Sequence, residues 1–356
     1  MSELRSVYDP EWSGIVDAHA HVFPDPIGEV AQRSSELTGV GREELATWKG
    51  RFRQASRPIT GLIHRAYAGL RHFPPPVRLG VEELGALLPG AGLLIEGSSQ
   101  DLLESMDRNS IAASVLIAHP PVISNERVLS LAETFPSQIV PAVNFGKLSG
   151  LSVNEALAEF RAAIDRTEGK LLLKIHAAAD GENAESPRYR SLIDIASEWA
   201  IPVILHTGCL QAHLIHRSPE QGHPALYRSW FADWPRLPFI LAHMNMHDPA
   251  AALELGEEFE NLFVDTSWQP TEVIGEAVRR MGSERILFGS DWPLVGDNQT
   301  VGLSRISEAE AAGYISQEQA DAIRGGNLHR LLLAAHKVTV GRLSELRQER
   351  EVLDAP

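Results

Sequence analysis

The residues best suited to chemistry begin with two histidines placed two positions apart after an apolar run. In GIVDAHAHVF, residues 14–23, Asp17, His19 and His21 alternate with Ala18 and Ala20. Side chains along a β-strand alternate between its faces, so we expect the aspartate and both histidines to share one face and the alanines the other. Two neutral imidazoles one strand pitch apart can chelate a single divalent metal ion. The stretch therefore predicts part of a metal site.

The pair alone is weak evidence, because 14 histidines among 356 residues give such a pair by chance about half the time. Two hydrogen-bonded structural histidines are the ordinary alternative. The remaining ligand-type residues favour the metal site, since apolar runs of strand length end at His176, His206, His243 and Asp291. Neutral imidazoles with one carboxylate form a common ligand set for zinc or a similar ion.

The elements that would position these residues alternate between strand-like and helical patterns. Eight apolar runs of strand length occupy residues 14–22, 113–118, 139–144, 170–176, 201–206, 238–243, 261–266 and 285–291. Helical stretches include residues 99–109, 154–166, 189–200 and 271–281, and the tail from His336 is predicted to form one further helix. This α/β alternation predicts one domain over residues 1–356, a closed (β/α)8 TIM barrel whose strand ends meet at one mouth. An open doubly wound sheet is the alternative, but no Gly-rich loop follows the first run.

One connection is much longer than a barrel requires, and residues 24–97 form a predicted insertion that is partly helical. Between Leu45 and Val81 there is no acidic residue, whereas seven are basic, namely Lys49, Arg51, Arg53, Arg57, Arg65, Arg71 and Arg78. Three interpretations remain open. The segment is an amphipathic helix with arginines toward solvent, a lid whose Arg53 and Arg57 bind a carboxylated substrate, or a surface that docks on another subunit.

Composition narrows the range of partners. Acidic residues outnumber basic ones 47 to 32, for a formal charge of −15, which argues against nucleic acid or an anionic membrane as a partner. The single cysteine, Cys209, excludes an internal disulfide and suits a reducing compartment. No stretch has the pattern of a signal peptide or the length of a membrane span, so we expect a cytoplasmic protein acting on a small-molecule substrate.

Seven motifs in this order resemble the amidohydrolase superfamily, in particular the amidohydrolase-related branch that includes aminocarboxymuconate-semialdehyde decarboxylase and many predicted metal-dependent hydrolases. They are DAHAHVF, DLLESMDRNSIAASVL, LLLKIH, PVILHTG, PFILAH, LFVDTS and ILFGSDWP, and they span nearly the whole predicted barrel. The resemblance implies that His19, His21, His206 and Asp291 bind one divalent metal ion. Zinc is the default for this ligand set, with manganese or iron(II) as alternatives. Homodimers are common among these relatives, and the resemblance extends that expectation to this chain.

The same resemblance implies roles for the residues around the metal. His243 would act as acid or base without binding the metal, and Asp291 would also accept a proton from water. Lys174 and His176 would line the substrate pocket; in binuclear relatives a lysine at this strand is carbamylated and bridges two metals, a role not assigned to Lys174. One departure is HMNMH, residues 243–247, where the family often has glycine after the histidine. That bulk is expected to reshape the pocket beside His243.

Other residues near the motifs have ordinary explanations. A helical metal-binding pair of His243 and His247 is disfavoured, because the glutamate of a His-Glu-x-x-His motif is missing. Asp17 is expected to support the ligands or the framework without binding the metal, and Asp265 to belong either to the pocket or to the framework. We expect a small buried thiol at Cys209, and surface or packing roles for the three histidines of the following loop, His213, His216 and His223.

These residues predict a metal-dependent hydrolase that uses metal-activated water on a small, carboxylated substrate. Two alternatives stay open. The first is a non-oxidative decarboxylase of an aromatic or unsaturated acid in the same site, and the second is a catalytically silent barrel that binds a metabolite.

Overall fold

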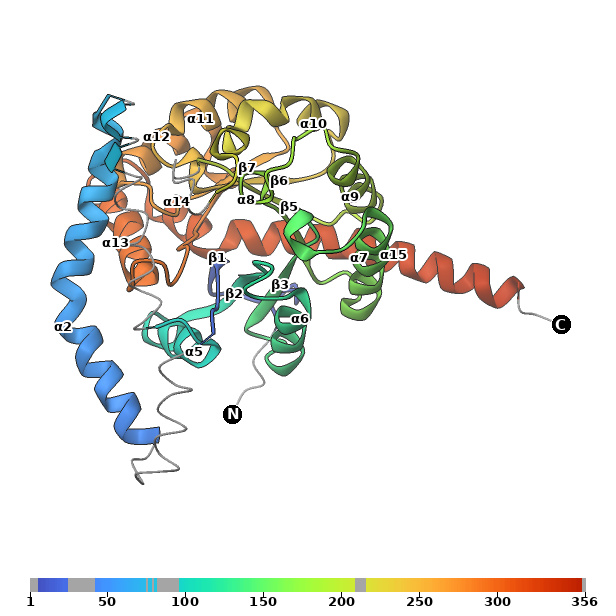
Figure 1. Ribbon diagram of the computed structural model, residues 1–356, viewed down its shortest axis with the longest axis horizontal. Coiled ribbons are helices and arrows are strands. Elements are labelled where there is room, and N and C mark those ends of the chain that lie inside the picture. Colours follow the sequence, from blue (N-terminus) through green and yellow to red (C-terminus); the bar gives the residue numbers. More distant parts are fainter. Residues whose placement is uncertain are drawn as a thin grey trace.

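Eight parallel strands in sequential order form the centre of the molecule, a computed structural model that describes residues 6–24, 42–74, 76–78, 80–81, 96–208 and 216–353 (Figure 1). The strands are β1 (Ile15–Ala20), β2 (Ile111–Ile117), β3 (Ile139–Asn144), β4 (Leu172–Ile175), β5 (Val203–His206), β6 (Phe239–Ala242), β7 (Leu262–Asp265) and β8 (Ile286–Leu287). Backbone bonds from Ala18 N to Phe288 O (2.7 Å) and from His21 N to Trp292 O (2.8 Å) join the first strand to the last. The predicted TIM barrel is confirmed.

The strands are buried on both faces, as their apolar sequences predict. One face of the sheet lines the barrel interior, where Val16, Val115 and Ile204 belong to one core cluster. The other face packs against the surrounding helices in a second cluster, which includes Leu173 and Val264. The site at the barrel mouth therefore stands on a framework that is packed from inside and outside.

Helices follow the strands and cover the outer face of the sheet. They are α5 (Ser99–Arg108), α6 (Asn125–Thr134), α7 (Val153–Thr167), α8 (Ala177–Asp180), α9 (Pro187–Glu198), α10 (Arg228–Asp233), α11 (Pro249–Glu258), α12 (Thr271–Met281), α13 (Asn298–Ala311) and α14 (Gln317–Asp321). Short 3-10 turns lie at η1 (Leu70–His72), η2 (Lys147–Ser149), η3 (Pro219–Gly222), η4 (Pro224–Tyr227), η5 (His243–Asn245) and η6 (Ser283–Arg285), and a π-turn at η7 (Ala322–Gly326). Capping boxes at Ser98, Ser152 and Ser316 fix three helix starts, because each serine bonds the backbone of the third helical residue.

Two long helices lie outside this regular pattern. Helix α2 (Arg42–Gly69) lies between β1 and α5 in sequence and stands along one side of the barrel, at the left in Figure 1. Helix α15 (Asn327–Leu353) passes the barrel and projects beyond it at the C-terminus. The prediction of a separate tail helix from His336 is wrong, because one continuous helix begins nine residues earlier and its Leu328 packs with Trp12 below the barrel.

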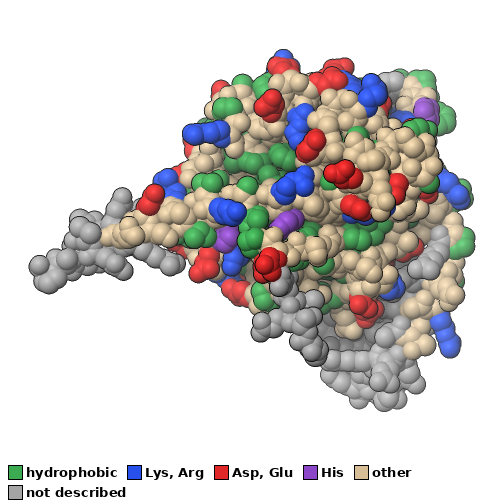
Figure 2. Space-filling model, turned by 180° about the vertical axis from the view of Figure 1, so that it is seen from behind, with side chains coloured by type: hydrophobic (Ala, Val, Ile, Leu, Met, Phe, Trp, Pro, Cys, Tyr) green, Lys and Arg blue, Asp and Glu red, His purple; other side chains and the backbone are tan. Residues whose placement is uncertain are grey.

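The surface carries charges of both signs. On the face in Figure 2, acidic and basic side chains are interspersed. Arg166, for example, pairs with Glu126 and Glu133 at 2.5 and 2.7 Å. Among the described residues, no helix combines the length and apolarity that crossing a bilayer demands.

Candidate active site at the barrel mouth

A bulge in β1 sets the directions of its polar side chains. The pairing with β2 shifts between residues 17 and 20, and Ala18 faces the interior cluster whereas Ala20 packs with the helices. The carboxylate of Asp17 accepts hydrogen bonds from Ser290 Oγ (2.6 Å) and Gln299 Nε2 (3.0 Å) on the helix side. The expectation that Asp17 shares the face of the histidines, with both alanines opposite, is therefore wrong, because the extra residue of the bulge interrupts strict alternation.

The two histidines of β1 meet through the nitrogens that a metal ion would need. His19 Nδ1 bonds to Asp265 Oδ2 (2.9 Å) and His21 Nδ1 to the Ile117 carbonyl (3.3 Å), so each ring holds its proton on Nδ1. Their Nε2 atoms lie 3.2 Å apart, and 3.5 and 3.4 Å from Asp291 Oδ1. Two imidazole lone pairs that face each other beside a carboxylate oxygen repel unless a cation lies between them. The donor set thus fits a divalent metal ion.

The second oxygen of Asp291 is held by an indole. Trp268 Nε1 donates a 2.6 Å hydrogen bond to Asp291 Oδ2, which directs Oδ1 toward the histidines. Both residues have left-handed backbone angles, with φ of 65° at Trp268 and 57° at Asp291. Burial opposes ionisation of Asp291, but the surrounding imidazoles of His243, His21 and His19 outweigh it and hold its pKa well below the usual range. Asp291 therefore stays a carboxylate.

His243 lies at the end of β6, next to this group. One ligand-type atom from each of His19, His243 and Asp291 lies within 4.8 Å of the others. His243 Nδ1 bonds to Ser267 Oγ (2.7 Å), which in turn donates to Asp265 Oδ1. Burial lowers the pKa of His243 to about 4, although Asp291 opposes the shift. This hydrogen-bonded chain fixes the orientation of the ring.

The chain makes an unusual turn immediately after this strand. Residues His243 to Met246 all have positive φ, between 45° and 62°, a region that costs non-glycine residues roughly 1–2 kcal/mol each. Gln269 Nε2 holds both ends, bonding the His243 carbonyl (2.6 Å) and the Met246 carbonyl (2.8 Å). Gly208 passes so close that a Cβ there would lie 2.3 Å from Asn245 C. Met244, directly after His243, packs in the core beside the helices.

The other side of the mouth is formed by a lysine and by histidine side chains. Lys174 on β4 is buried, and the rings of His176 and His206 stack with centroids 3.7 Å apart. The ring centroid of His216 lies 5.2 Å from that of His176, and the ring centroid of His119 lies 5.7 Å from that of His176. We call these five residues the basic half of the mouth, and His19, His21, Asp265 and Asp291 the acidic half.

Three imidazoles of the basic half, those of His119, His176 and His206, are held neutral. Burial is the main cause that lowers the pKa of His119, to about 3, and that lowers the pKa values of His176 and His206 far below the ordinary value. Neighbouring rings and the ammonium of Lys174 add to the shift in all three residues. Lys174 is the charged group that acts on all three of these imidazoles.

The structure distributes the predicted site residues between these groups. His206 lies with His176 and His216, one ligand-type atom of each within 4.8 Å of the others, and its ring centroid is 4.9 Å from that of His243. Its Nε2 is buried without a hydrogen-bond partner among the described residues. The side chains of Arg53 and Arg57, and all of Cys209 and His213, lie outside the described part of the chain.

Four residues of the site were missed or misplaced by sequence reasoning. His216 is buried against His176 and His206, which excludes the surface role and agrees with the packing role expected for it. His119 follows the predicted strand 113–118 directly, and the rule that strand ends carry ligands would have found it. Ser267 and Trp268 follow strand β7 by two and three residues, but serine and tryptophan are not ligand-type residues and carried no signal.

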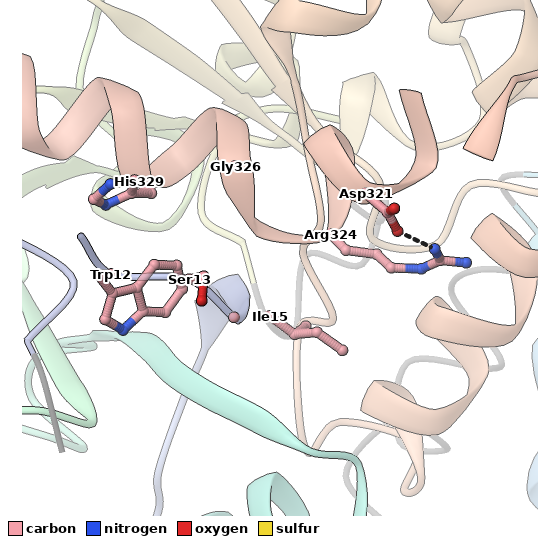
Figure 3. A pocket seen from close by; sticks show the side chains of 8 residues that line it. Trp12, Ser13, Ile15, Asp321, Arg324, Gly326 and His329 are labelled. Atoms are coloured by element: carbon pink, nitrogen blue, oxygen red, sulfur yellow. Dashed lines mark hydrogen bonds and ion pairs between the residues drawn. The ribbon is translucent and has the colours of Figure 1, made fainter. Parts of the chain in front are cut away.

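A separate cavity of about 600 Å³ lies at the opposite end of the barrel. Figure 3 shows Trp12, Ser13 and Ile15 at the start of β1 facing the η7 and α15 region. Its Arg324 is paired with Asp321 at 2.8 Å. Barrel enzymes place their chemistry at the carboxyl ends of the strands, so this cavity is not the candidate active site.

The fold and this mouth define a (β/α)8 barrel enzyme with a histidine-rich site. The amidohydrolase family model matches residues 16–333, and the chain belongs to this family. No curated protein matches the chain in sequence.

Solved structures resemble the fold at low sequence identity. An uncharacterised TIM-barrel protein from Bordetella bronchiseptica is 18% identical, with a TM-score of 0.59 over 90% of this chain and 99% of that one. A 5-carboxyvanillate decarboxylase from Novosphingobium aromaticivorans, complexed with manganese and a nitrobenzoic acid, is 14% identical, with a TM-score of 0.54 and coverages of 93% and 99%. A probable 2-pyrone-4,6-dicarboxylic acid hydrolase from Acinetobacter baumannii is 12% identical, with a TM-score of 0.51 and coverages of 90% and 99%. These likenesses show a shared fold.

Proposed function

We propose that this protein is a metal-dependent hydrolase acting on a small, carboxylated substrate. The observation that carries the proposal is the convergence of His19 Nε2, His21 Nε2 and Asp291 Oδ1 within 3.5 Å of one another. Both imidazoles keep their protons on Nδ1, and three acceptor atoms then face a common point. Such a cluster stabilises a cation and little else.

His19, His21 and Asp291 are proposed to hold one divalent ion, with His206 as a fourth ligand because its buried Nε2 has no partner among the described residues. Zinc is the ion we propose first, with manganese or iron(II) as alternatives. When bound, the ion supplies Lewis acidity and lowers the pKa of a water molecule toward 7. Asp291 would accept a proton from the attacking water.

His243 is proposed to move a proton to or from the substrate. Its Nδ1 is engaged by Ser267 at 2.7 Å, which leaves Nε2 for the reacting atoms. Lys174 and His176 are proposed to orient the substrate. Ala179 N donates to His176 Nδ1 (3.2 Å), so His176 presents its Nε2 proton as a donor for a substrate oxygen.

The same residues support non-oxidative decarboxylation as a second candidate. The buried ammonium of Lys174 among neutral imidazoles suits a substrate carboxylate, and a carboxylate held there is either retained or released as carbon dioxide. His243 would then deliver a proton to carbon. The hydrolase in the Acinetobacter structure and the decarboxylase in the Novosphingobium structure illustrate both reactions on this fold.

Metal content and product analysis test the proposal together. Protein purified without chelator is expected to hold about one divalent ion per chain, and His19→Ala is expected to lose it. The metal-loaded protein is then assayed on a panel of lactones, esters, amides and aromatic acids that carry carboxylates, with proton release and carbon dioxide measured in parallel. A protein that holds no metal and cannot be loaded contradicts the proposal and favours a silent binding barrel.

A further inference from the structure

Helix α2 reaches the barrel mouth through a stripe of polar and aromatic side chains. Thr60 and His64 are buried, and Tyr67 lies on the same side of the helix at the next turn. Ile59 and Leu62, on the other side, are 62% and 60% exposed. This pattern is the reverse of an amphipathic helix that docks by apolar contacts. The buried stripe therefore has a specific partner in the barrel.

The partner is the loop region that carries Trp268 and the segment after β8. The imidazole of His64 stacks on the Trp268 ring, with centroids 5.5 Å apart and planes at 26°. Its Nε2 donates to the Gly296 carbonyl (3.2 Å), and Arg305 donates to its backbone carbonyl (3.4 Å). Tyr67, on the same helix as His64, also contacts the indole: the centroids of the Tyr67 and Trp268 rings lie 5.1 Å apart. Two rings from α2 thus hold one indole.

His64 remains neutral in this place. Burial and the nearby Arg305 guanidinium lower its pKa to about 4. The proton on Nε2 is used by the Gly296 carbonyl, so the ring is fixed against Trp268 without a charge. A neutral, buried ring stacked on an indole restricts the rotation of that indole.

The indole in turn holds the carboxylate of the acidic half. Trp268 Nε1 lies 2.6 Å from Asp291 Oδ2, and Asp291 Oδ1 faces the Nε2 atoms of the β1 histidines. Rotation of the indole would release Oδ2 and let the carboxylate turn away from the histidines.

We propose that His64 and Tyr67 of α2 are positioning residues, which fix the Trp268 indole so that Asp291 keeps one oxygen directed at the metal. The inference rests on the metal site of the proposed function and adds a dependence of that site on α2, a helix that contributes none of the proposed ligands. Groups that orient a metal ligand typically change metal affinity by about 10–100-fold when removed.

The test measures zinc affinity by competition with a chromophoric chelator, and ligand geometry by the visible spectrum of the cobalt(II)-loaded protein. Trp268→Phe keeps the ring and removes the N–H, and is expected to weaken zinc binding about 10–100-fold. His64→Ala is expected to weaken it in the same direction, by at least about threefold, and to alter the cobalt spectrum. Leu62→Ala, an exposed site on the same helix, is the matched control and is expected to match the wild type.

A double variant distinguishes positioning from unrelated damage. If His64 acts through the indole, His64→Ala combined with Trp268→Phe binds zinc no more weakly than Trp268→Phe alone. Losses that add, or a His64→Ala protein that binds zinc like Leu62→Ala, overturn the inference while leaving the metal site in place. If His64→Ala does not fold, Tyr67→Leu makes the same comparison from the second ring. A wild-type protein that binds no zinc overturns the proposed function, and this inference with it.

Discussion

The two halves of the barrel mouth differ in charge and in how firmly their side chains are held. In the acidic half, both carboxylates are fixed by hydrogen bonds. Asp265 accepts one from His19 Nδ1 (2.9 Å), and Asp291 accepts one from Trp268 Nε1 (2.6 Å). In the basic half, the rings of His176 and His206 stack on each other, and His206 Nε2 has no partner among the described residues. The first half has the features of a prepared cation site, whereas the second has those of a surface that a ligand completes.

His243 connects the two halves. Its ring lies 4.6 Å from that of His19 and 4.9 Å from that of His206. A group that moves protons between metal-activated water and a bound substrate has to stand between their sites. The comparison therefore assigns metal affinity to the acidic half together with His206, substrate affinity to the rest of the basic half and turnover to the residue between them.

The largest effect is expected from Asp291→Asn. The substitution keeps the shape of the side chain but removes the negative charge that the acidic half offers to a cation. Activity should fall by about 10⁴-fold or more, since a bound metal ion contributes several kcal/mol to the transition state. Metal analysis after dialysis measures the cause directly. Asp194→Asn, at an exposed position of α9, is the control, and normal metal content in Asp291→Asn would contradict the division of the mouth.

His243→Ala should produce the next largest loss. Turnover is expected to fall by about 10²–10⁴-fold while the metal remains, because a general acid or base contributes that much without holding the ion. The variant is best compared with His206→Ala, for which we expect the opposite result, a loss of metal. Both are measured as metal content and single-turnover rate. Metal loss in His243→Ala would show that His243 is a ligand, as its place beside His19 and Asp291 allows.

Sequence reasoning succeeded where a repeated pattern carried the signal. Every predicted apolar run overlaps a strand, and residues 139–144 and 271–281 were predicted to the residue as β3 and α12. The reason is physical, because strands of a parallel barrel are buried on both faces and stand out as continuous apolar runs. The start of the last helix was predicted nine residues too far along the chain. Its first turns, around Leu328, are buried and lack the charged composition of its exposed end, from which the helix was predicted.

The site was less predictable because part of it depends on local geometry. The bulge that turns Asp17 toward Gln299 arises because β1 has to fit between β2 and β8. No residue in GIVDAHAHVF indicates this bulge. His216 enters the mouth from a connection, where no periodicity fixes direction. Trp268 acts through one indole proton, and its partner Asp291 stands 23 positions away. Such roles become visible only after the chain has folded.

Lys174→Met tests the basic half. The substitution preserves the length of the side chain and removes the ammonium, so kcat/KM should fall by about 10–100-fold, the value of one charge-assisted hydrogen bond. Metal content should not change. Lys170→Met, at the partly exposed lysine before β4, is the matched control. A loss of metal in Lys174→Met would mean that the lysine belongs to the cation site, as it does in binuclear relatives.

The smallest effect is expected from His176→Gln. A glutamine can still offer an N–H to a substrate oxygen. It lacks the Nδ1 atom that accepts a hydrogen bond from Ala179 N, and it lacks the ring that stacks on His206. We expect kcat/KM to fall about two- to fivefold, mainly through KM, because a neutral hydrogen bond contributes about 1 kcal/mol and its direction is only partly lost. His223→Gln is a close control, since His223 also accepts a backbone N–H through Nδ1 (3.3 Å from Ala225 N) but is exposed, outside the mouth. Equal kinetics in the two variants would remove His176 from the substrate surface and narrow the basic half to Lys174 and its remaining imidazoles.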